Sequence, residues 1–293
     1  TGALDELRRI EQFHPSDLKI PFAMATAKLH CGDAEGAARV LTRVKSETRA
    51  WRASRRDRAE LKANLAIIEY RLGRRDRAQV IETVRKALKD SEYQSLGIAK
   101  MLTSFYSRRS DANTLEKLHQ TLLQLHDEAD LYEIETRLAV LKAEFRRAVD
   151  LSVRWVGREP FDSDAALVAT YLLTDVAQDY ETAIRIGAEA LKRIPDAKGV
   201  ANNVAYALAL AGRPKEARKF LPKVFPTDKS RPFFVATEAL IHLASGDVEG
   251  GSRGYEKAAA VAAEYGDEDL ANLIRCQAMV LIARFTKTVA SWP

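Results

Sequence analysis

A helical phrase that recurs every 34 to 35 residues constrains this chain more than any other feature of its sequence. Residues 177–195 read AQDYETAIRIGAEALKRIP, in which Ala183 precedes Pro195 by twelve residues, and a similar phrase at 143–160 lies 35 residues earlier. A fixed period of this length predicts stacked structural units, each too small to bury its own apolar face. Small residues that mark the same place in the phrase recur along the chain: Ala3, Ala37, Ala78, Ala148, Ala183, Ala217 and Gly251.

Each unit carries the pattern of two antiparallel helices. A glycine and a second turn residue separate two apolar stretches, as at Gly32–Asp33 and Gly246–Asp247. We expect glycine to end the first helix in the left-handed conformation, and proline to end the second because it cannot continue the hydrogen-bond ladder. Connections of about two residues force the helices antiparallel. The expected helix pairs are about 17–31 and 34–48, 58–72 and 75–89, 92–108 and 112–126, 129–142 and 145–157, 163–177 and 180–194, 198–211 and 214–225, and 232–245 and 248–265, with a last helix over about 267–287.

The period breaks in two places. Ala37 and Ala78 are 41 residues apart, and this excess over one period predicts an insertion near Arg49–Arg58. Ala78 and Ala148 are 70 residues apart, or two periods, so a degenerate unit is expected near residue 113. The register of that unit stays open at this point.

The period, the Gly-Asp type of turn and the terminal proline together resemble the tetratricopeptide-repeat family over nearly the whole chain. This resemblance implies an all-α fold, a right-handed superhelical solenoid of antiparallel helix pairs. We expect one solenoid over residues 1–293, with a half repeat at 1–15, seven repeats over about 16–265 and a capping helix over about 267–287. The chain opens inside a repeat without an initiating Met, so we expect a fragment of a longer protein.

The resemblance also implies that first helices line a concave groove for a peptide segment or a partner protein. In the family, asparagines on the first helices often hold the ligand backbone, and Asn64 and Asn203 match that placement. The lysine-and-asparagine clamp that some members use for acidic C-terminal tails is not reproduced. Helical spacing adds further candidates for the groove, each of which is equally well explained as a plain exposed residue: Arg71, Lys100, Arg108 and Tyr206.

The insertion between the first two full units is rich in arginine. Residues 1–110 hold 23 Lys and Arg against 14 Asp and Glu, whereas residues 111–293 hold 23 against 27. Arginine beside an aromatic ring can bind phosphate or stack on bases, and arginines at 71–77 can extend the patch. In the alternative, the tryptophan packs the joint between units and the arginines are solvated or paired to acids. The patch consists of Arg49, Trp51, Arg52, Arg55, Arg56 and Arg58.

The sequence shows no pattern that predicts catalysis, a cofactor or a metal site. His119 and His126 are seven residues apart, and we expect them to be surface histidines on one helix face rather than zinc ligands. Cys31 and Cys276 are expected to be free, buried thiols in a reducing compartment, so we expect a cytoplasmic protein. The glycines of residues 250–254 lie in an expected helix, which argues against a phosphate cradle. No run of about 18 apolar residues predicts a membrane span.

Three functions agree with these features. The first is a protein-protein interaction scaffold that binds a peptide segment or partner protein in the groove. The second is a self-association or regulatory arm of a larger multidomain enzyme or signalling protein. The third, less favoured, is nucleic-acid binding through the basic N-terminal end.

Overall fold

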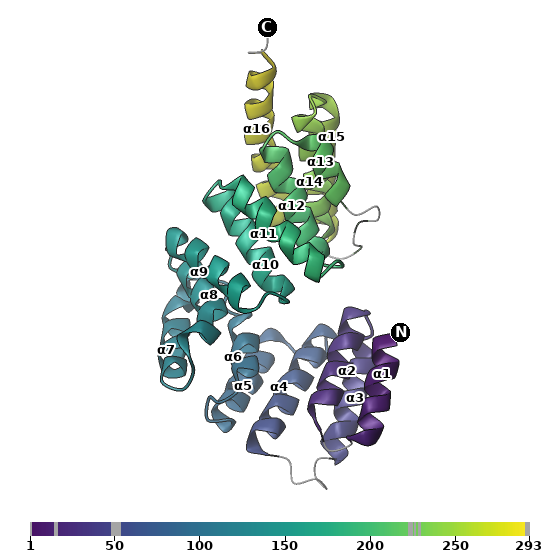
Figure 1. The fold of residues 1–293 in the computed structure, drawn as a ribbon, viewed down its shortest axis with the longest axis vertical. Helices are drawn as coiled ribbons and strands as arrows, with labels where there is room; N and C mark the ends of the chain where they lie inside the picture. Colours follow the sequence, from purple (N-terminus) through teal and green to yellow (C-terminus); the bar gives the residue numbers. More distant parts are fainter. Residues whose placement is uncertain are drawn as a thin grey trace. The chain divides into compact units, whose positions relative to one another are not determined.

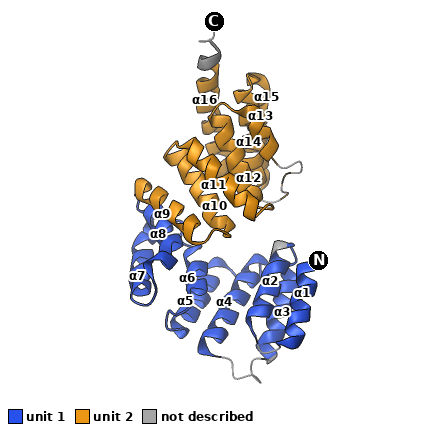
Figure 2. Cartoon of the chain, in the orientation of Figure 1, with its two compact units in different colours: residues 1–142 blue, residues 143–293 orange. Residues whose placement is uncertain are grey.

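The computed structural model describes residues 2–14, 17–47, 54–221, 225, 227 and 230–290. Over these residues the chain consists of helices and short connections, without a β-strand. The chain divides into two compact units, Thr1–Lys142 and Ala143–Pro293 (Figure 2). Each unit has its own apolar core of buried alanine, leucine, valine and isoleucine side chains.

The first unit is built from antiparallel neighbours (Figure 1). Helix α2 packs against α3, α4 against α5, and α7 against α8, while α4, α6 and α8 contact one another in a row as the first helices of successive pairs. Short 3-10 turns at Arg109–Asp111 and Glu128–Leu131 precede α7 and α8. The helices are α1 Gly2–Phe13, α2 Lys19–His30, α3 Ala34–Glu47, α4 Arg55–Arg71, α5 Arg77–Asp90, α6 Leu96–Thr103, α7 Ala112–Leu123 and α8 Tyr132–Leu141.

The second unit repeats the same arrangement more regularly. Helices α10, α12, α14 and α16 contact one another in sequence as a row, and α11, α13 and α15 pack beside them. Helix α10 continues into a π-helical turn, Leu172–Val176. The helices are α9 Phe145–Arg158, α10 Ser163–Tyr171, α11 Tyr180–Arg193, α12 Lys198–Leu210, α13 Pro214–Phe220, α14 Arg231–Ala244, α15 Val248–Glu264 and α16 Glu268–Ala290.

The predicted helices are therefore found, with three informative differences at their ends. Helix α6 starts at Leu96 rather than near residue 92, because Glu92 and Tyr93 have φ of 54° and 61°, which no α-helix contains. Helix α13 ends at Phe220 rather than near 225. Leu221 has ψ of 131°, the extended conformation favoured by a residue that precedes proline, here Pro222. Helix α7 ends at Leu123, which leaves His126 outside it. The division into a half repeat, seven repeats and a cap stays a prediction.

The second helices reveal the correct register of the repeat. Aspartates cap several of them, and the residue four positions after the cap is buried against the preceding helix, as Ala37 follows Asp33 and Ala183 follows Asp179. In α5 the cap is Asp76, so the equivalent residue is Val80, which is fully buried, and not Ala78, which is exposed. The assignment of Ala78 to the repeated position was wrong by two residues. The same counting in α7 gives Leu115, also buried.

The connection between the two helices of a unit has the predicted left-handed residue. Gly32, Gly73, Gly212 and Gly246 have φ between 69° and 85°, so the predicted glycine caps are confirmed. Where a unit lacks glycine at this place, the chain still adopts the conformation, as at Gln178 with φ of 55°. A residue with a side chain is sterically strained in this left-handed conformation. The packing of the two helices, and not the local sequence, therefore imposes the turn geometry.

Close helix contact explains the glycine-rich stretch in α15. A Cβ atom on Gly251 would lie 2.4 Å from Cγ and Cδ2 of Leu243, and one on Gly254 would lie 2.7 Å from Cβ of Ala239. Both contacts are with α14. The glycines therefore let α14 and α15 approach closely, a role in packing that agrees with the expectation against a phosphate cradle.

Candidate functional site

In the first unit, the predicted binding residues of α4, and Arg108 just before the Arg109–Asp111 turn, lie at exposed or half-buried positions. Asn64 is half-buried, and its Nδ2 donates to the backbone oxygen of Glu60, one turn earlier, at 2.9 Å. Arg71 is exposed in the last turn of α4. Arg108 is exposed, and its backbone N–H donates to the carboxylate of Asp111 at 3.0 Å. The prediction that Arg108 lies on one helix face with Lys100 was wrong, because α6 ends at Thr103 and Arg108 is extended. Their role in binding stays a prediction.

Lys100 belongs to a charged network between α6 and α8. Its Nζ lies 3.4 Å from Oε2 of Glu133, and Nη2 of Arg137 lies 3.2 Å from Oε1 of the same carboxylate. Burial raises the pKa of the Glu133 carboxyl, and the charges of Arg137 and Lys100 oppose that shift. Lys100 thus compensates a buried acid on the neighbouring first helix, and its role in binding stays a prediction.

In the second unit, Asn203 joins α12 to α10. Its Nδ2 donates to the backbone oxygen of Leu167 and to Oγ1 of Thr170, both at 3.1 Å. Both donor hydrogens of this amide are therefore directed to the adjacent first helix, and only its oxygen is left for a ligand. Its neighbour Asn202 is buried.

Tyr206 lies in a polar cluster formed by three elements of the second unit. Its hydroxyl donates to Oδ1 of Asp175 at 3.3 Å and accepts a hydrogen bond from Nε2 of Gln277 in α16 at 2.8 Å. Burial is the main cause that raises the pKa of Tyr206, and the negative charge of Asp175 adds to it. We call Tyr171, Asp175, Tyr206 and Gln277 the Asp175 cluster.

The carboxylate at the centre of this cluster has no cationic partner among the residues that the structure describes. Asp175 is solvent-accessible, yet burial by the surrounding protein raises the pKa of its carboxyl, against the hydrogen bond from Tyr206. Tyr171 is 53% exposed, and burial followed by the charge of Asp175 raises the pKa of its hydroxyl. An accessible but partly desolvated carboxylate beside aromatic rings attracts a positive group more strongly than an isolated surface acid does.

Sequence reasoning named Tyr206 but missed the rest of the cluster. Tyr171 and Tyr206 are 35 residues apart, one period, and so occupy equivalent positions on neighbouring first helices. The sequence could therefore have shown that these two tyrosines lie side by side. It could not have placed Asp175 beside them, because Asp175 lies in the π-helical turn, which shifts its side chain from the place that regular α-helical spacing assigns to it.

The arginine-rich patch is only partly within the described residues, since Arg49, Trp51 and Arg52 lie outside them. Two of its other members are paired with acids. Arg55 Nη1 lies 2.6 Å from Glu92, and Arg56 Nε lies 3.0 Å from Glu60.

Arg58 is exposed and has no acid partner within the described part of the chain. The neighbouring Arg74 pairs with Glu35 at 2.6 Å, and Arg75 with Glu69. Pairing lowers the charge that this surface offers a phosphate backbone, and the nucleic-acid function stays a prediction.

Two expectations about single residues were wrong. His119 is buried rather than on the surface, and its Nε2 lies 2.8 Å from Oε1 of Glu135, because α7 turns this face toward α8. Cys31 and Cys276 are free, as expected, but both are exposed. Cys31 is the residue that caps α2, and Cys276 lies on the side of α16 opposite its buried Ile274 and Ala278.

The described residues contain no group of three or more His, Cys, Asp or Glu side chains placed to hold a metal ion. Within the same part of the chain, no helix combines the length and apolar character needed to cross a membrane. The polar contacts described above are ion pairs and hydrogen bonds. Such groups can recognise a ligand through charge and geometry.

The chain is similar to known proteins in its fold and not in its sequence. No family model and no curated protein matches the sequence. The structure is similar to the Cut9–Hcn1 hetero-tetramer of the APC/C, with a TM-score of 0.54 and 12% identity over 91% of this chain and 54% of that chain. A tetratricopeptide-repeat protein from Parabacteroides merdae gives a TM-score of 0.49 and 17% identity over 88% of this chain and 98% of that one.

The solved structures that this chain resembles are tetratricopeptide-repeat proteins. The chain has their all-α fold of stacked antiparallel helix pairs, as the sequence predicted.

Proposed function

We propose that the chain is a protein-interaction scaffold that holds a peptide segment of a partner on the first helices of its second unit. One observation carries this proposal: the Asp175 cluster presents an accessible carboxylate without a cationic partner in the described structure, next to Tyr171 and Tyr206. The fold supports it, because stacked helix pairs mainly supply extended binding surfaces.

The chemistry of the cluster indicates a basic side chain in the bound segment. A lysine or arginine can place its charge on the Asp175 carboxylate and its aliphatic stem on the ring of Tyr171. The carboxylate is partly desolvated before binding, so it has already lost some of its hydration, and the attraction is less screened than at an open surface. Asn203, one turn before Tyr206, has an amide oxygen left to accept a backbone N–H of the segment.

Defined peptides test this proposal. A fluorescent, acetylated pentapeptide with a central arginine between alanines is compared with one that has a central glutamine. We expect the arginine peptide to shift the backbone amide signals of Tyr171 and Asp175, and Asp175→Asn to weaken its binding about tenfold, the loss of one charged contact. Asp164→Asn, on an exposed carboxylate of the same helix, is the matched control and should leave binding unchanged.

Acidification provides a second readout. Because the folded pKa of Asp175 is raised, its carboxylate becomes protonated at a higher pH than an ordinary aspartate, and arginine-peptide binding should weaken from that pH downward. Equal binding of both peptides, or of wild type and Asp175→Asn, would show that this cluster is not the recognition site.

Self-association is a second candidate, favoured by a separate observation on α16. Leu273, Met279 and Val280 are 64%, 67% and 69% exposed, and Cys276 lies on the same side of the helix. An apolar stripe of this kind is often covered by another chain. Light scattering should then show a mass that rises with concentration, and Leu273→Glu with Val280→Glu should abolish the rise. A monomeric mass at every concentration would exclude this alternative.

A further inference from the structure

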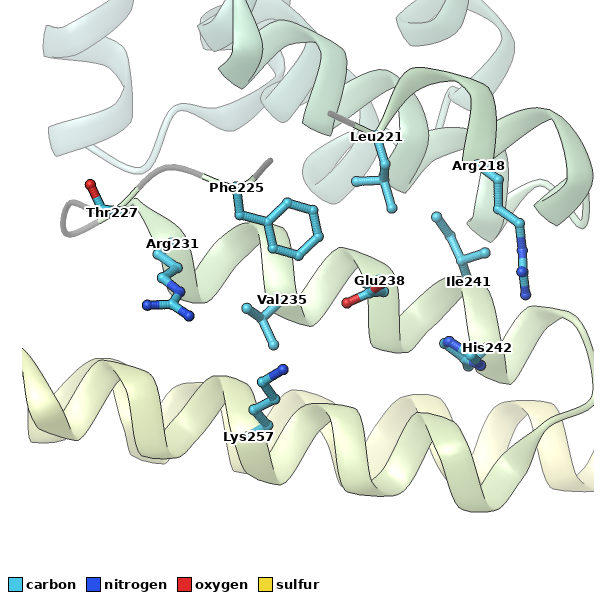
Figure 3. Close-up of a pocket in the computed structure, with 10 residues that line it drawn as sticks. All are labelled: Arg218, Leu221, Phe225, Thr227, Arg231, Val235, Glu238, Ile241, His242 and Lys257. Carbon is cyan, nitrogen blue, oxygen red and sulfur yellow. The ribbon is translucent and has the colours of Figure 1, made fainter. Parts of the chain in front are cut away.

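A pocket of about 660 Å³ lies between α13, α14 and α15 (Figure 3). Helix α13 has seven residues and α11 has 14, so α13 covers only part of α14 where a full-length second helix would cover more. The short helix follows from the proline after Leu221, which disfavours helical continuation. The pocket is therefore encoded locally, by the early end of one helix in an otherwise regular stack.

The floor of the pocket is one face of α14. Arg231, Val235, Glu238 and His242 follow one another at helical spacings of three or four residues, so they line a single stripe. Val235 is 3% exposed and, with the equally buried Ile241, makes the apolar part of the floor. With a rise of about 1.5 Å per residue, Arg231 and His242 stand about 16 Å apart along the helix axis.

Positive charge gathers at both ends of this stripe. Figure 3 shows Arg231 and Lys257 toward one end, and Arg218 toward the other, beside His242. Arg218, Arg231 and Lys257 form no ion pair with any residue that the structure describes. His242 is held by Asp247, with Nδ1 2.8 Å from Oδ2. Glu238 is the only acidic residue among those that line the pocket, and it lies between the two ends.

We propose that this pocket binds an extended acidic segment of a partner protein, in which one apolar residue separates two groups of carboxylates. A single small anion reaches one cationic end only, because the ends are separated by about 16 Å. An extended chain advances about 3.3 Å per residue, so about five residues span that distance. Glu238 lies between the two ends and repels a carboxylate at that place, so the segment carries an uncharged, apolar residue there, with Val235 and Ile241 of the floor on either side of Glu238.

The pocket is separate from the Asp175 cluster in residues and in sign of charge. It selects acidic segments, whereas the cluster selects a basic side chain, and no residue belongs to both. The two surfaces can therefore be tested independently, and failure of one leaves the other standing.

The probe is an acetylated heptapeptide of sequence Ala-Glu-Ala-Leu-Ala-Glu-Ala with a fluorescent tag, followed by anisotropy. We expect saturable binding that weakens as salt increases, at least tenfold weaker binding of the version with both glutamates replaced by glutamine, and weaker binding when glutamate replaces the central leucine. Backbone amide signals of Val235 and Ile241 should shift in wild-type protein.

Charge reversal then locates the contacts. Arg218→Glu and Arg231→Glu should each weaken binding of the acidic heptapeptide at least tenfold, with helicity unchanged. Arg253→Glu, on the exposed Arg253 of α15 that does not line the pocket, is the matched control and should bind as wild type. The proposal is overturned by any of three results: no saturable binding up to about 1 mM, equal affinity for the glutamine peptide, or unchanged affinity in both pocket variants. Binding of free phosphate as tightly as the heptapeptide would also overturn it, because the two ends would then not act together on one segment.

Discussion

Adding one methyl group at Gly251 should destabilise the second unit, because no space exists for it between α14 and α15. The new Cβ would lie 2.4 Å from two side-chain atoms of Leu243 and 3.1 Å from the backbone oxygen of Ala239. Leu243 is 1% exposed, so its side chain is enclosed by neighbouring atoms and cannot turn out into solvent without a wider rearrangement. The two helices must separate, or Leu243 must leave its preferred rotamer.

Two opposing effects determine the size of the change in unfolding free energy. Replacing glycine by alanine inside a helix stabilises it by about 1 kcal/mol. Inserting a carbon into a packed core costs about 1 to 3 kcal/mol, and contacts this short place Gly251→Ala near the upper end of that range. The net destabilisation is therefore about 2 kcal/mol, which lowers the melting temperature by about 4 to 8 °C for a unit of this size.

Urea unfolding followed by circular dichroism measures this effect, and Gly157→Ala provides the control. Gly157 lies in the last turn of α9, and a Cβ there would meet nothing within 4 Å. That variant should be slightly more stable than wild type, by about 0.5 kcal/mol, because only helix propensity changes. If Gly251→Ala is as stable as Gly157→Ala, α14 and α15 do not approach as closely as described.

Three further outcomes are expected. Gln178→Gly should stabilise the protein by about 0.5 to 1 kcal/mol in urea unfolding, because glycine adopts φ of 55° without a steric penalty, whereas Gly212→Gln should have the opposite effect. The hydrogen bond from the Gly250 backbone, and then that with His242, hold the pKa of the Asp247 carboxyl below 3.8, so its stabilisation is complete above that pH and is lost as pH falls through the folded pKa. The difference in stability between wild type and Asp247→Asn should therefore shrink below about pH 4 in urea titrations, and a constant difference would contradict this assignment. Finally, both thiols should react with a thiol reagent in the native protein, and protection of either would contradict the exposure of Cys31 and Cys276.

Much of the fold was predictable because repetition multiplies weak local signals. A single glycine or alanine has little meaning, but Gly32, Gly212 and Gly246 recur with the period and take the same left-handed conformation. The predicted register was wrong in α5, where the repeated position was assigned by residue type, alanine, and not by its distance from the cap residue. Val80 fills the place given to Ala78, because burial at that place requires an apolar side chain of suitable size and not alanine itself.

The binding surfaces were less predictable, because each depends on side chains from several helices. Asn203 and Tyr206 were identified on their helix face, but their contacts with Thr170 and Gln277 join residues 33 and 71 positions apart. The pocket beside α14 follows from the early end of α13, which the sequence interpretation had extended to residue 225. The exposure of Cys276 was also predicted wrongly. Apolar residues near it in the sequence lie on both faces of α16, and Cys276 lies on the exposed face.

The sequence by itself determined the all-α class, the period and the antiparallel pairing, because these depend on local conformational preferences and short connections that repeat. Only the tertiary structure decided which polar groups remain available. It pairs Arg55 with Glu92 of the connection after α5 and Lys100 with Glu133 of α8, and it leaves the Asp175 carboxylate without a cation within the described residues. The physical reason is that charge compensation and desolvation depend on distances between helices, whereas helix formation depends on residues a few positions apart.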